Sequence, residues 1–209
     1  MQIKKTILTE SVTLEELRKF IREGRAAEVL AVGDQIYIDF DGAAVPYDVI
    51  GIDVDTPAAE RLKHTVTIQA HELIEERPFD IKRNYGSNDW EASTLRKYLN
   101  SEAYAARCAE LAKYAIPVIK TNTYGRKTVD TFFLLSVGEY DTKNTPYEYY
   151  KDKLYRAAKH PKDDFNDWHS TRSACCGSPY QAWGVSPSGH YGYFIVNCFQ
   201  RYAPACVIG

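Results

Sequence analysis

Cysteine and histidine are the side chains of this 209-residue chain that would hold a metal or act as nucleophiles, and neither follows a recognisable spacing. The five cysteines are Cys108, Cys175, Cys176, Cys198 and Cys206. An odd number without a CxxC pair argues against both a disulfide framework and a zinc site. The adjacent cysteines 175 and 176 can be bridged only with strain. We therefore expect free thiols that hold no metal.

The five histidines, His64, His71, His160, His169 and His190, do not form a motif either. His64 and His71 flank a strand pattern seven residues apart, which does not place them on a common metal. We interpret both as ordinary polar residues. The chain also lacks the GxSxG, HExxH, P-loop and GxGxxG motifs. We therefore expect no enzyme activity, no catalytic residues, no cofactor and no metal.

One acidic stretch leaves metal binding as an open alternative. Asp163, Asp164, Asn166 and Asp167 offer the oxygen ligands that calcium takes. The simpler interpretation is a solvated acidic loop, and the sequence does not decide whether a calcium ion binds there.

Composition excludes several classes of protein. The formal net charge of −2 lacks the basic footprint of a general nucleic-acid binder. No apolar run approaches the ~20 residues of a membrane span, and residues 1–10 lack the apolar core of a signal peptide. We expect a soluble protein made in a bacterial cytoplasm, with the virion tail or the cell surface as further destinations.

The first half of the chain predicts one helix and three strands. Thr13 and Glu16 have the spacing of a capping box, which predicts a helix over about 14–23 that stops at Gly24. Alternation predicts strands at 32–40 and 47–54 with a hairpin turn at Asp41-Gly42, and a further strand at 66–70. We divide the chain into an N-terminal helical segment, 1–30, packed on or preceding a domain, 31–209.

The middle of the chain predicts two more helices. In 87–100, Asn88 and Glu91 have capping-box spacing and Leu95 and Leu99 form an apolar pair. A helix over about 102–114 should end before Pro117. The apolar run 132–137 predicts a buried strand, and the polar stretch 139–167 a long surface excursion. The fold class is α+β, with core residues Trp90, Leu95, Leu99, Phe133 and Leu135.

The tail, residues 168–209, differs in composition from everything before it. It has no Lys, Asp or Glu, and its only charged side chains at neutral pH are Arg172 and Arg201. It contains eight aromatic residues and four of the five cysteines. A stretch rich in Tyr, Ser, Gly, Asn and His is similar in composition to an antibody paratope, which provides rigid contact area at low entropy cost.

Four segments occur in a recognisable order: SNDWEASTLRKYLN at 87–100, FLLS at 133–136, TRS at 171–173 and YAPACVI at 202–208. In these the chain resembles a domain family of gut bacteria and their phages, many of whose members are variable proteins of diversity-generating retroelements. The phage tropism determinants on tail fibres are relatives of these variable proteins. His169-Ser170 departs from the family pattern, which has an aromatic residue or Leu there, and Arg201-Tyr202 replaces Gly-Val.

The resemblance implies a C-type-lectin-like fold with two main helices, small twisted antiparallel sheets and much irregular structure. It also implies a diversified ligand-binding region over about 168–203. Mutagenesis of AAC codons leaves codons ending in C, which cannot encode Lys, Glu, Gln, Met or Trp. The tail has no Lys, Glu or Met, as this predicts. Because C-ending codons cannot encode Trp or Gln either, Trp168, Trp183, Gln181 and Gln200 would belong to the scaffold. A buried aromatic tail would also lack Lys and Glu.

We expect a ligand-recognition protein whose hypervariable surface binds a protein or glycan on a host cell. It should bind no nucleic acid and insert in no membrane, and the N-terminal segment would support a homo-oligomer or attachment to a particle. The expected ligand-binding residues are Tyr180, Ser186, Ser188, His190, Tyr191, Tyr193, Phe194, Asn197, Phe199 and Arg201. Aromatic side chains would supply contact area, and the polar ones hydrogen bonds.

Two alternatives remain. Formylglycine-generating enzymes are oxidoreductases on the same broad fold, and they are similar to this chain in having C-terminal cysteines that would bind copper as a thiolate pair. Cys198 and Cys206 are eight residues apart, and the closer spacing of that family is absent. The other alternative is a purely structural phage particle protein.

Overall fold

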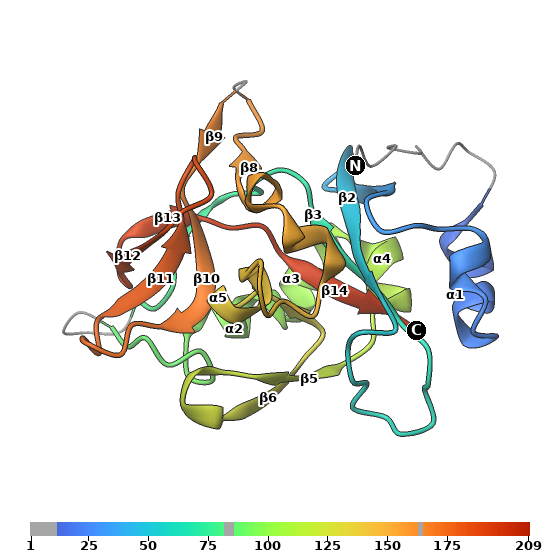
Figure 1. Ribbon diagram of the computed structural model, residues 1–209, viewed down its shortest axis with the longest axis horizontal. Helices are drawn as coiled ribbons and strands as arrows, with labels where there is room; N and C mark the ends of the chain where they lie inside the picture. Colours follow the sequence, from blue (N-terminus) through green and yellow to red (C-terminus); the bar gives the residue numbers. More distant parts are fainter. Residues whose placement is uncertain (1–11, 82–85, 163–164) are drawn as a thin grey trace.

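Two mostly antiparallel sheets of five strands each organise the chain in the computed structural model (Figure 1). The structure describes residues 12–81, 86–162 and 165–209. The first sheet has the order β1-β2-β3-β14-β7, with all neighbours antiparallel. Its strands are β1 (Gln35–Phe40), β2 (Ala43–Ile52), β3 (Val66–Ala70), β14 (Ala205–Ile208) and β7 (Phe132–Phe133). The C-terminal strand therefore lies inside the sheet that the first strands begin.

The second sheet has the order β12-β11-β10-β13-β4 and carries most of the tail. Its strands are β12 (Tyr191–Ile195), β11 (Gln181–Val185), β10 (His169–Ala174), β13 (Phe199–Arg201) and β4 (Glu76–Pro78). Only three residues, 202–204, join β13 to β14, so the two sheets are closely linked (Figure 1). Two small sheets pair β5 (Val118–Thr121) with β6 (Lys127–Asp130) and β8 (Ala158–Lys159) with β9 (Asn166–Asp167).

The helices are short. They are α1 (Leu14–Arg22), α2 (Thr94–Leu99), α3 (Glu102–Arg107), α4 (Ala109–Tyr114) and α5 (Val137–Tyr140), with 3₁₀ helices η1 (Ala26–Glu28), η2 (Thr123–Gly125), η3 (Glu148–Lys151) and η4 (Lys153–Arg156). The architecture is mixed α+β, as expected. Among the described residues, no helix is long and apolar enough to cross a bilayer.

The predictions of a capped first helix and of a hairpin turn are confirmed, whereas β1 begins later than expected, at Gln35, and the return strand β2 begins earlier, at Ala43. Thr13 caps α1: its Oγ1 accepts from the Glu16 backbone N–H at 3.2 Å, and the Glu16 carboxylate accepts from the Thr13 N–H at 2.8 Å. Gly24 follows the helix at φ +71°, in the left-handed region that ends helices. Asp41 and Gly42 both have positive φ and join β1 to β2, as a two-residue type I′ hairpin turn requires.

Two helix predictions are wrong in detail. The helix in 87–100 begins later than the capping-box spacing indicates, because Ser93 and not Asn88 caps α2. The expected helix over 102–114 is broken at Cys108, which has non-helical φ and ψ and separates α3 from α4. The Cys108 side chain is fully buried at this break, so tertiary packing overrides local helix propensity.

The expected core is confirmed, since Trp90, Leu95, Leu99, Phe133 and Leu135 are each at most 2% exposed. The run 132–135 is buried, but only its first two residues pair as β7. Ser136 then caps α5 in a capping box with Glu139, which ends the extended segment.

The prediction of a surface excursion over 139–167 is wrong for four of its five tyrosines. Tyr140, Tyr147, Tyr149 and Tyr150 are each at most 5% exposed. Their hydroxyls bond to buried polar groups: Tyr147 donates to Asp55 at 2.8 Å and Tyr149 to Asp48 at 2.8 Å. Tyrosine can bury its ring while the hydroxyl keeps a partner, so a polar-looking segment became part of the core.

Candidate functional site

The predicted ligand-binding region is an exposed aromatic surface on the second sheet. We call it the tail surface and define it by Tyr180, Trp183, Tyr193, Ile195 and Phe199. Trp183 lies directly opposite Tyr193, and Gln181 opposite Ile195, so these side chains share one face of the β11–β12 pair. The Trp183 and Tyr193 rings meet edge to face at 6.0 Å. Tyr193 is 60% and Ile195 44% exposed.

Backbone hydrogen bonds bring the remaining members beside this face. The Val196 N–H donates to the Tyr180 carbonyl at 3.0 Å, which places Tyr180 beside the end of β12. The Cys198 N–H donates to the Ile195 carbonyl at 2.9 Å in a tight turn that leads into Phe199. Tyr180 is 45% and Phe199 67% exposed. The backbones that carry these side chains, on β11, β12, β13 and just before β11, therefore lie close together.

Asn88 fixes the loop that leads into β11. Its side-chain Nδ2 lies 3.1, 2.8 and 2.9 Å from the backbone carbonyls of Cys175, Ser178 and Gln181. Its backbone N–H donates to the Pro179 carbonyl at 2.9 Å. The residue that its spacing assigned to a helix cap instead holds the backbone under Tyr180.

Arg172 fixes β10 through buried contacts with the segments around Thr121, Leu134 and Glu139. It is 2% exposed and donates to the backbone carbonyls of Leu134 at 2.7 Å and Thr121 at 3.1 Å. It also forms an ion pair with Glu139, whose other oxygen accepts from Lys120 at 2.7 Å. Burial alone would raise the pKa of Glu139, but the Arg172 and Lys120 charges outweigh it and lower that pKa to about 2.

The structure exposes most of the predicted ligand-binding residues and buries the others in part. Exposed are Tyr180, Ser188, His190, Tyr193, Asn197 and Phe199; half-buried are Tyr191, Phe194 and Arg201; buried is Ser186. Tyr191 packs under Arg156, whose guanidinium lies 4.9 Å from the ring centroid. Arg201 pairs with Glu76 at 2.9 Å and Asp167 at 3.2 Å, so it is already engaged within the protein.

Ser186 forms the β11–β12 turn and does not face solvent. Its Oγ accepts from the His190 backbone N–H at 3.1 Å and lies 3.0 Å from the Ser188 Oγ. Its backbone N–H donates to the His190 carbonyl at 2.8 Å. Residues 186–189 therefore form a turn, and the side chain expected on the ligand-binding surface is used to build that turn.

Trp168 and Trp183, both expected to be largely buried scaffold, do not lie in the core. Trp168 is 42% exposed, and Trp183 is half-buried. A Cβ at Gly192 would lie 2.7 Å from the Trp168 ring, so the ring lies against the bare backbone of β12. Trp168 covers a strand from its solvent side instead of entering the core.

The described thiols are free, as expected. Cys176 and Cys198 are exposed, whereas Cys108 and Cys206 are buried. Burial raises the pKa of the Cys108 thiol to about 11 and raises the pKa of Cys206 well above its usual value. An exposed Cys198 and a buried, protonated Cys206 do not resemble a thiolate pair.

No group of three or more His, Cys, Asp or Glu in the described part of the chain is arranged to hold a metal. Of the acidic stretch considered for calcium, Asp163 and Asp164 lie outside the described residues. Asp167 accepts from Arg201 and Asn166 donates to the Pro187 carbonyl at 3.1 Å.

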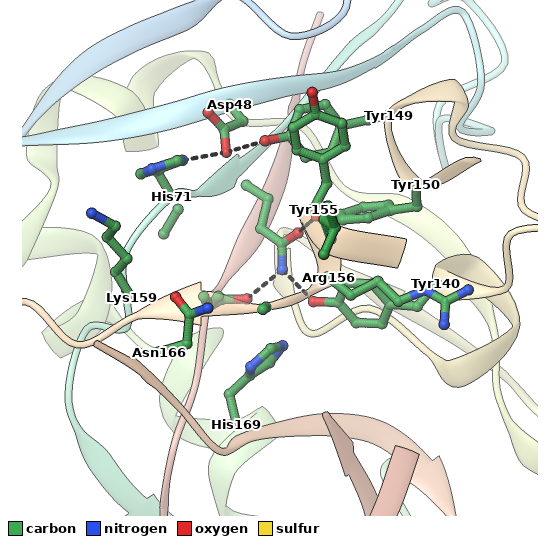
Figure 2. A pocket seen from close by; sticks show the side chains of 16 residues that line it. Asp48, His71, Tyr140, Tyr149, Tyr150, Tyr155, Arg156, Lys159, Asn166 and His169 are labelled. Carbon is green, nitrogen blue, oxygen red and sulfur yellow. Dashed lines mark hydrogen bonds and ion pairs between the residues drawn. The ribbon is translucent and has the colours of Figure 1, made fainter. Parts of the chain in front are cut away.

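A polar cavity of about 250 Å³, which no sequence pattern predicted, lies between β3, the 3₁₀ helices η3 and η4, and the start of β10 (Figure 2). Gln69 is one of its lining residues: the amide nitrogen donates to the Tyr140 hydroxyl at 2.7 Å and to the Ala203 carbonyl at 3.0 Å, and the amide oxygen accepts from Tyr150. Beside it, the Asp48 carboxylate accepts from the His71 Nδ1 at 2.7 Å.

His169 lines the same cavity and is 1% exposed. Neither ring nitrogen makes a hydrogen bond of good geometry within the described chain, and no dashed line reaches the ring in Figure 2, although the Asp167 backbone lies beside the ring. Burial lowers the pKa of His169 to about 4, more than the nearby Asp167 raises it, so the ring is neutral at pH 7. The signal in the sequence was His169-Ser170, where the chain departs from the pattern that it otherwise resembles.

A comparison with known families places most of this architecture in one domain. The family model described as "Domain of unknown function (DUF6273)" matches residues 63–208. The match includes the segments 87–100 and 133–136, the cavity residues from Gln69 onward and the whole tail surface, while α1, β1 and β2 precede it. No curated protein and no solved structure matches the chain.

Proposed function

The chain belongs to the DUF6273 domain family, and we propose that it is a ligand-recognition protein whose tail surface binds a protein or glycan on a host cell. The observation that carries this proposal is where large apolar side chains are exposed. Six of the twelve exposed large hydrophobic residues among those described fall within 165–199: Phe165, Trp168, Tyr180, Tyr193, Ile195 and Phe199. Exposed apolar patches with aromatic anchors are typical of binding surfaces.

A second support is the separation of surface from scaffold. The fold depends little on the exposed rings of Tyr193 and Phe199. The backbone of the sheet that carries them is held by Asn88 and Arg172, which lie outside the surface. A rigid backbone with adaptable exposed side chains is the design of antibody paratopes. Such a surface tolerates many side chains without loss of the fold.

We extend the proposal to diversification by a retroelement on a C-type-lectin-like scaffold. The small sheets, the short helices and the extensive irregular structure support that scaffold. The exposed residues Tyr180, Ser188, Tyr193, Asn197 and Phe199 are all types that C-ending codons encode. A weak single site would gain avidity from display in several copies on a particle.

Binding to whole cells tests the proposal even though the ligand is unidentified. Fluorescently labelled protein is incubated with a panel of gut bacterial strains and measured by flow cytometry. The test variant replaces Tyr180, Tyr193 and Phe199 by Ser. The matched control replaces three comparably exposed residues outside the tail by Ser: Tyr37, Ile81 and Val129.

The proposal predicts that the wild-type protein and the control label the same strain and that the test variant loses at least tenfold in binding, because a few aromatic anchors carry most interface energy. Both variants should retain the wild-type melting temperature within a few degrees, since exposed substitutions cost about 0.5 kcal/mol or less each. An equal loss of binding in both variants, or no loss of binding in the test variant, would contradict the proposal that the tail surface is the binding site.

A further inference from the structure

The outer edge of the second sheet is open at β12. This strand is the last in the order β12-β11-β10-β13-β4 and pairs only with β11 among the strands of the described chain. Figure 1 shows it on the outside of that sheet, beyond β11. None of its five residues, 191–195, is buried. The strand therefore has one edge that no neighbouring strand in the described ranges covers.

The hydrogen bonds at the two ends of the β11–β12 pair identify which backbone groups point outward. The Ser186 N–H donates to the His190 carbonyl at 2.8 Å, and the Val196 N–H donates to the Tyr180 carbonyl at 3.0 Å. Both bonds continue the regular register between the strands. In an antiparallel pair every second residue bonds to the partner strand. The even-numbered residues of β12 therefore bond to β11, and the odd-numbered residues present their N–H and C=O groups on the open edge.

Three residues, Tyr191, Tyr193 and Ile195, thus present backbone groups on the open edge. The Ile195 carbonyl accepts from the Cys198 N–H at 2.9 Å, which occupies one end of the edge. The other outward N–H and C=O groups of the three form no hydrogen bond to a residue that the structure describes. Tyr193 is the middle residue, and its side chain is 60% exposed. A row of unpaired donors and acceptors of this kind is a template for another strand.

The other ends of the two five-stranded sheets are protected. At β7 the Asn100 side chain takes the place of a strand: its Oδ1 accepts from the Thr131 N–H at 2.7 Å, and its Nδ2 donates to the Phe132 carbonyl at 2.9 Å. β4 consists of two charged residues and Pro78, and β1 exposes Asp39. Charged side chains, proline and covering groups are the means by which proteins block sheet edges. β12, with the sequence YGYFI, has no charge and no proline.

The sequence around the open edge favours a second copy of this chain as the strand that pairs there. Residues 173–200 contain no Lys, Arg, Asp or Glu, so two copies meet without like charges. When two copies pair about a twofold axis through Tyr193, residue 191 faces residue 195 of the other copy and Tyr193 faces its own counterpart. Aromatic residues directly opposite each other stabilise a strand pair. Because the charges and the proline of β4 block the opposite edge, the assembly closes at two copies instead of growing into a filament.

We infer that two copies of this chain form a dimer through antiparallel pairing of β12 with β12, which joins their second sheets into one continuous sheet. The twofold axis is perpendicular to that sheet, so side chains that share a face in one copy lie on the same face as their counterparts. The face of Trp183, Tyr193 and Ile195 then continues from one copy into the other. Two tail surfaces side by side would bind a cell with avidity, a consequence that rests on the proposed function. The pairing itself needs no ligand.

Sedimentation equilibrium of the full chain tests the inference without any ligand. The wild-type chain is measured from about 1 µM to about 1 mM, which covers the Kd values of weak, small interfaces. Two variants, Tyr193→Lys and Tyr193→Glu, place a charge on the twofold axis. A third, Ile195→Pro, removes an N–H that points to the partner copy and leaves the hydrogen bonds to β11 in place, as proline does on the outer side of an edge strand. Its control, Ile195→Val, keeps that N–H.

The wild-type chain should form a dimer and no larger species. Tyr193→Lys and Tyr193→Glu should each raise the dimer Kd at least about tenfold, because like charges then face each other. An equimolar mixture of these two variants should recover the dimer, since opposite charges meet, and a residue that only supports the fold would not produce this recovery. Ile195→Pro should raise the Kd about tenfold through two lost hydrogen bonds, while Ile195→Val should stay within about twofold of wild type.

A wild-type chain that stays monomeric over the whole range, or that forms open-ended oligomers, would overturn the inference. So would a Tyr193→Lys dimer as strong as wild type, or a mixture of the two charged variants that stays monomeric. Thermal melts verify that each variant folds, and if Ile195→Pro does not, the charged pair decides the question alone. A variant with Tyr180 and Phe199 replaced by Ser should still form the dimer, so failure of the tail surface and failure of the β12 pairing can be told apart.

Discussion

Replacing Glu139 by Gln should destabilise the protein more than any change on the tail surface. The Glu139 carboxylate joins two buried cations, Arg172 on β10 and Lys120 on β5, and Lys120 also pairs with Asp55 at 2.7 Å. Glutamine keeps the shape and removes the charge, so both cations lose their shared counter-ion. The variant therefore tests whether this network holds β10 in place.

The magnitude follows from the pKa of Glu139. A folded pKa of about 2 against the ordinary value of 4.5 corresponds to roughly 3 kcal/mol of stabilisation. Breaking a buried ion pair by removing one partner costs about 3–5 kcal/mol. For a chain of this length each kcal/mol shifts the melting temperature by about 2–4 °C. We expect a decrease of roughly 10 °C at pH 7.

The pH dependence has a definite sign. The unfolded chain binds a proton at Glu139 more readily than the folded chain, so the contribution is complete above about pH 5 and is lost as the pH falls toward 2. Glu75, whose pKa is also lowered to about 2, adds to the acid loss in both proteins. The difference between wild type and Glu139→Gln should therefore shrink as the solution is acidified.

Differential scanning calorimetry between about pH 7 and pH 3 measures both effects. The control is Glu148→Gln, because Glu148 forms an exposed pair with Lys151 and exposed pairs contribute about 0–1 kcal/mol. If Glu139→Gln melts within a degree or so of wild type at pH 7, the network does not hold β10. A difference that stays constant on acidification would refute the linkage.

Two further predictions concern the loop before β11 and the thiols. Asn88→Ala should lower the free energy of unfolding by about 1–3 kcal/mol in urea titrations, because three backbone carbonyls of the loop lose the side-chain amide that ties them to Asn88 and keep only the backbone donors within the loop; a change below about 0.5 kcal/mol would show that the loop does not need it. A thiol reagent should modify Cys176 and Cys198 quickly in the native protein and leave Cys108 and Cys206 unreacted until denaturant is added; rapid reaction of all five cysteines, or fewer than five after denaturation, would contradict the structure.

Local signals predicted the elements that depend on local chemistry. The Thr13–Glu16 capping box and the Asp41-Gly42 turn are formed within a few residues of chain, so spacing alone identifies them. The capping box assigned to Asn88 and Glu91 has the same spacing and fails. Carbonyls 87 to 93 residues away take the Asn88 amide, and Ser93 caps the helix instead.

The misassigned segments share one cause: their polar atoms form hydrogen bonds with residues that are far away in the sequence. Tyr149 reaches Asp48 and Tyr147 reaches Asp55, pairings that no local pattern reveals. The cavity at Gln69 combines residues from β3, η4 and β10, and it exists only once the two sheets meet. The tail surface was predictable in composition, while the burial of Ser186 was not.

Deep sequencing of the gene segment that encodes residues 168–209, from a population that carries it, tests the central proposal most directly. The proposal predicts substitutions concentrated at exposed tail codons, including those of Tyr180, Tyr193, Asn197 and Phe199, and absent from the buried positions Ala182 and Val196. A near-copy of the segment beside a reverse transcriptase gene should differ from it at adenines. An invariant segment, or substitutions spread evenly over exposed and buried codons, would contradict a diversified binding surface.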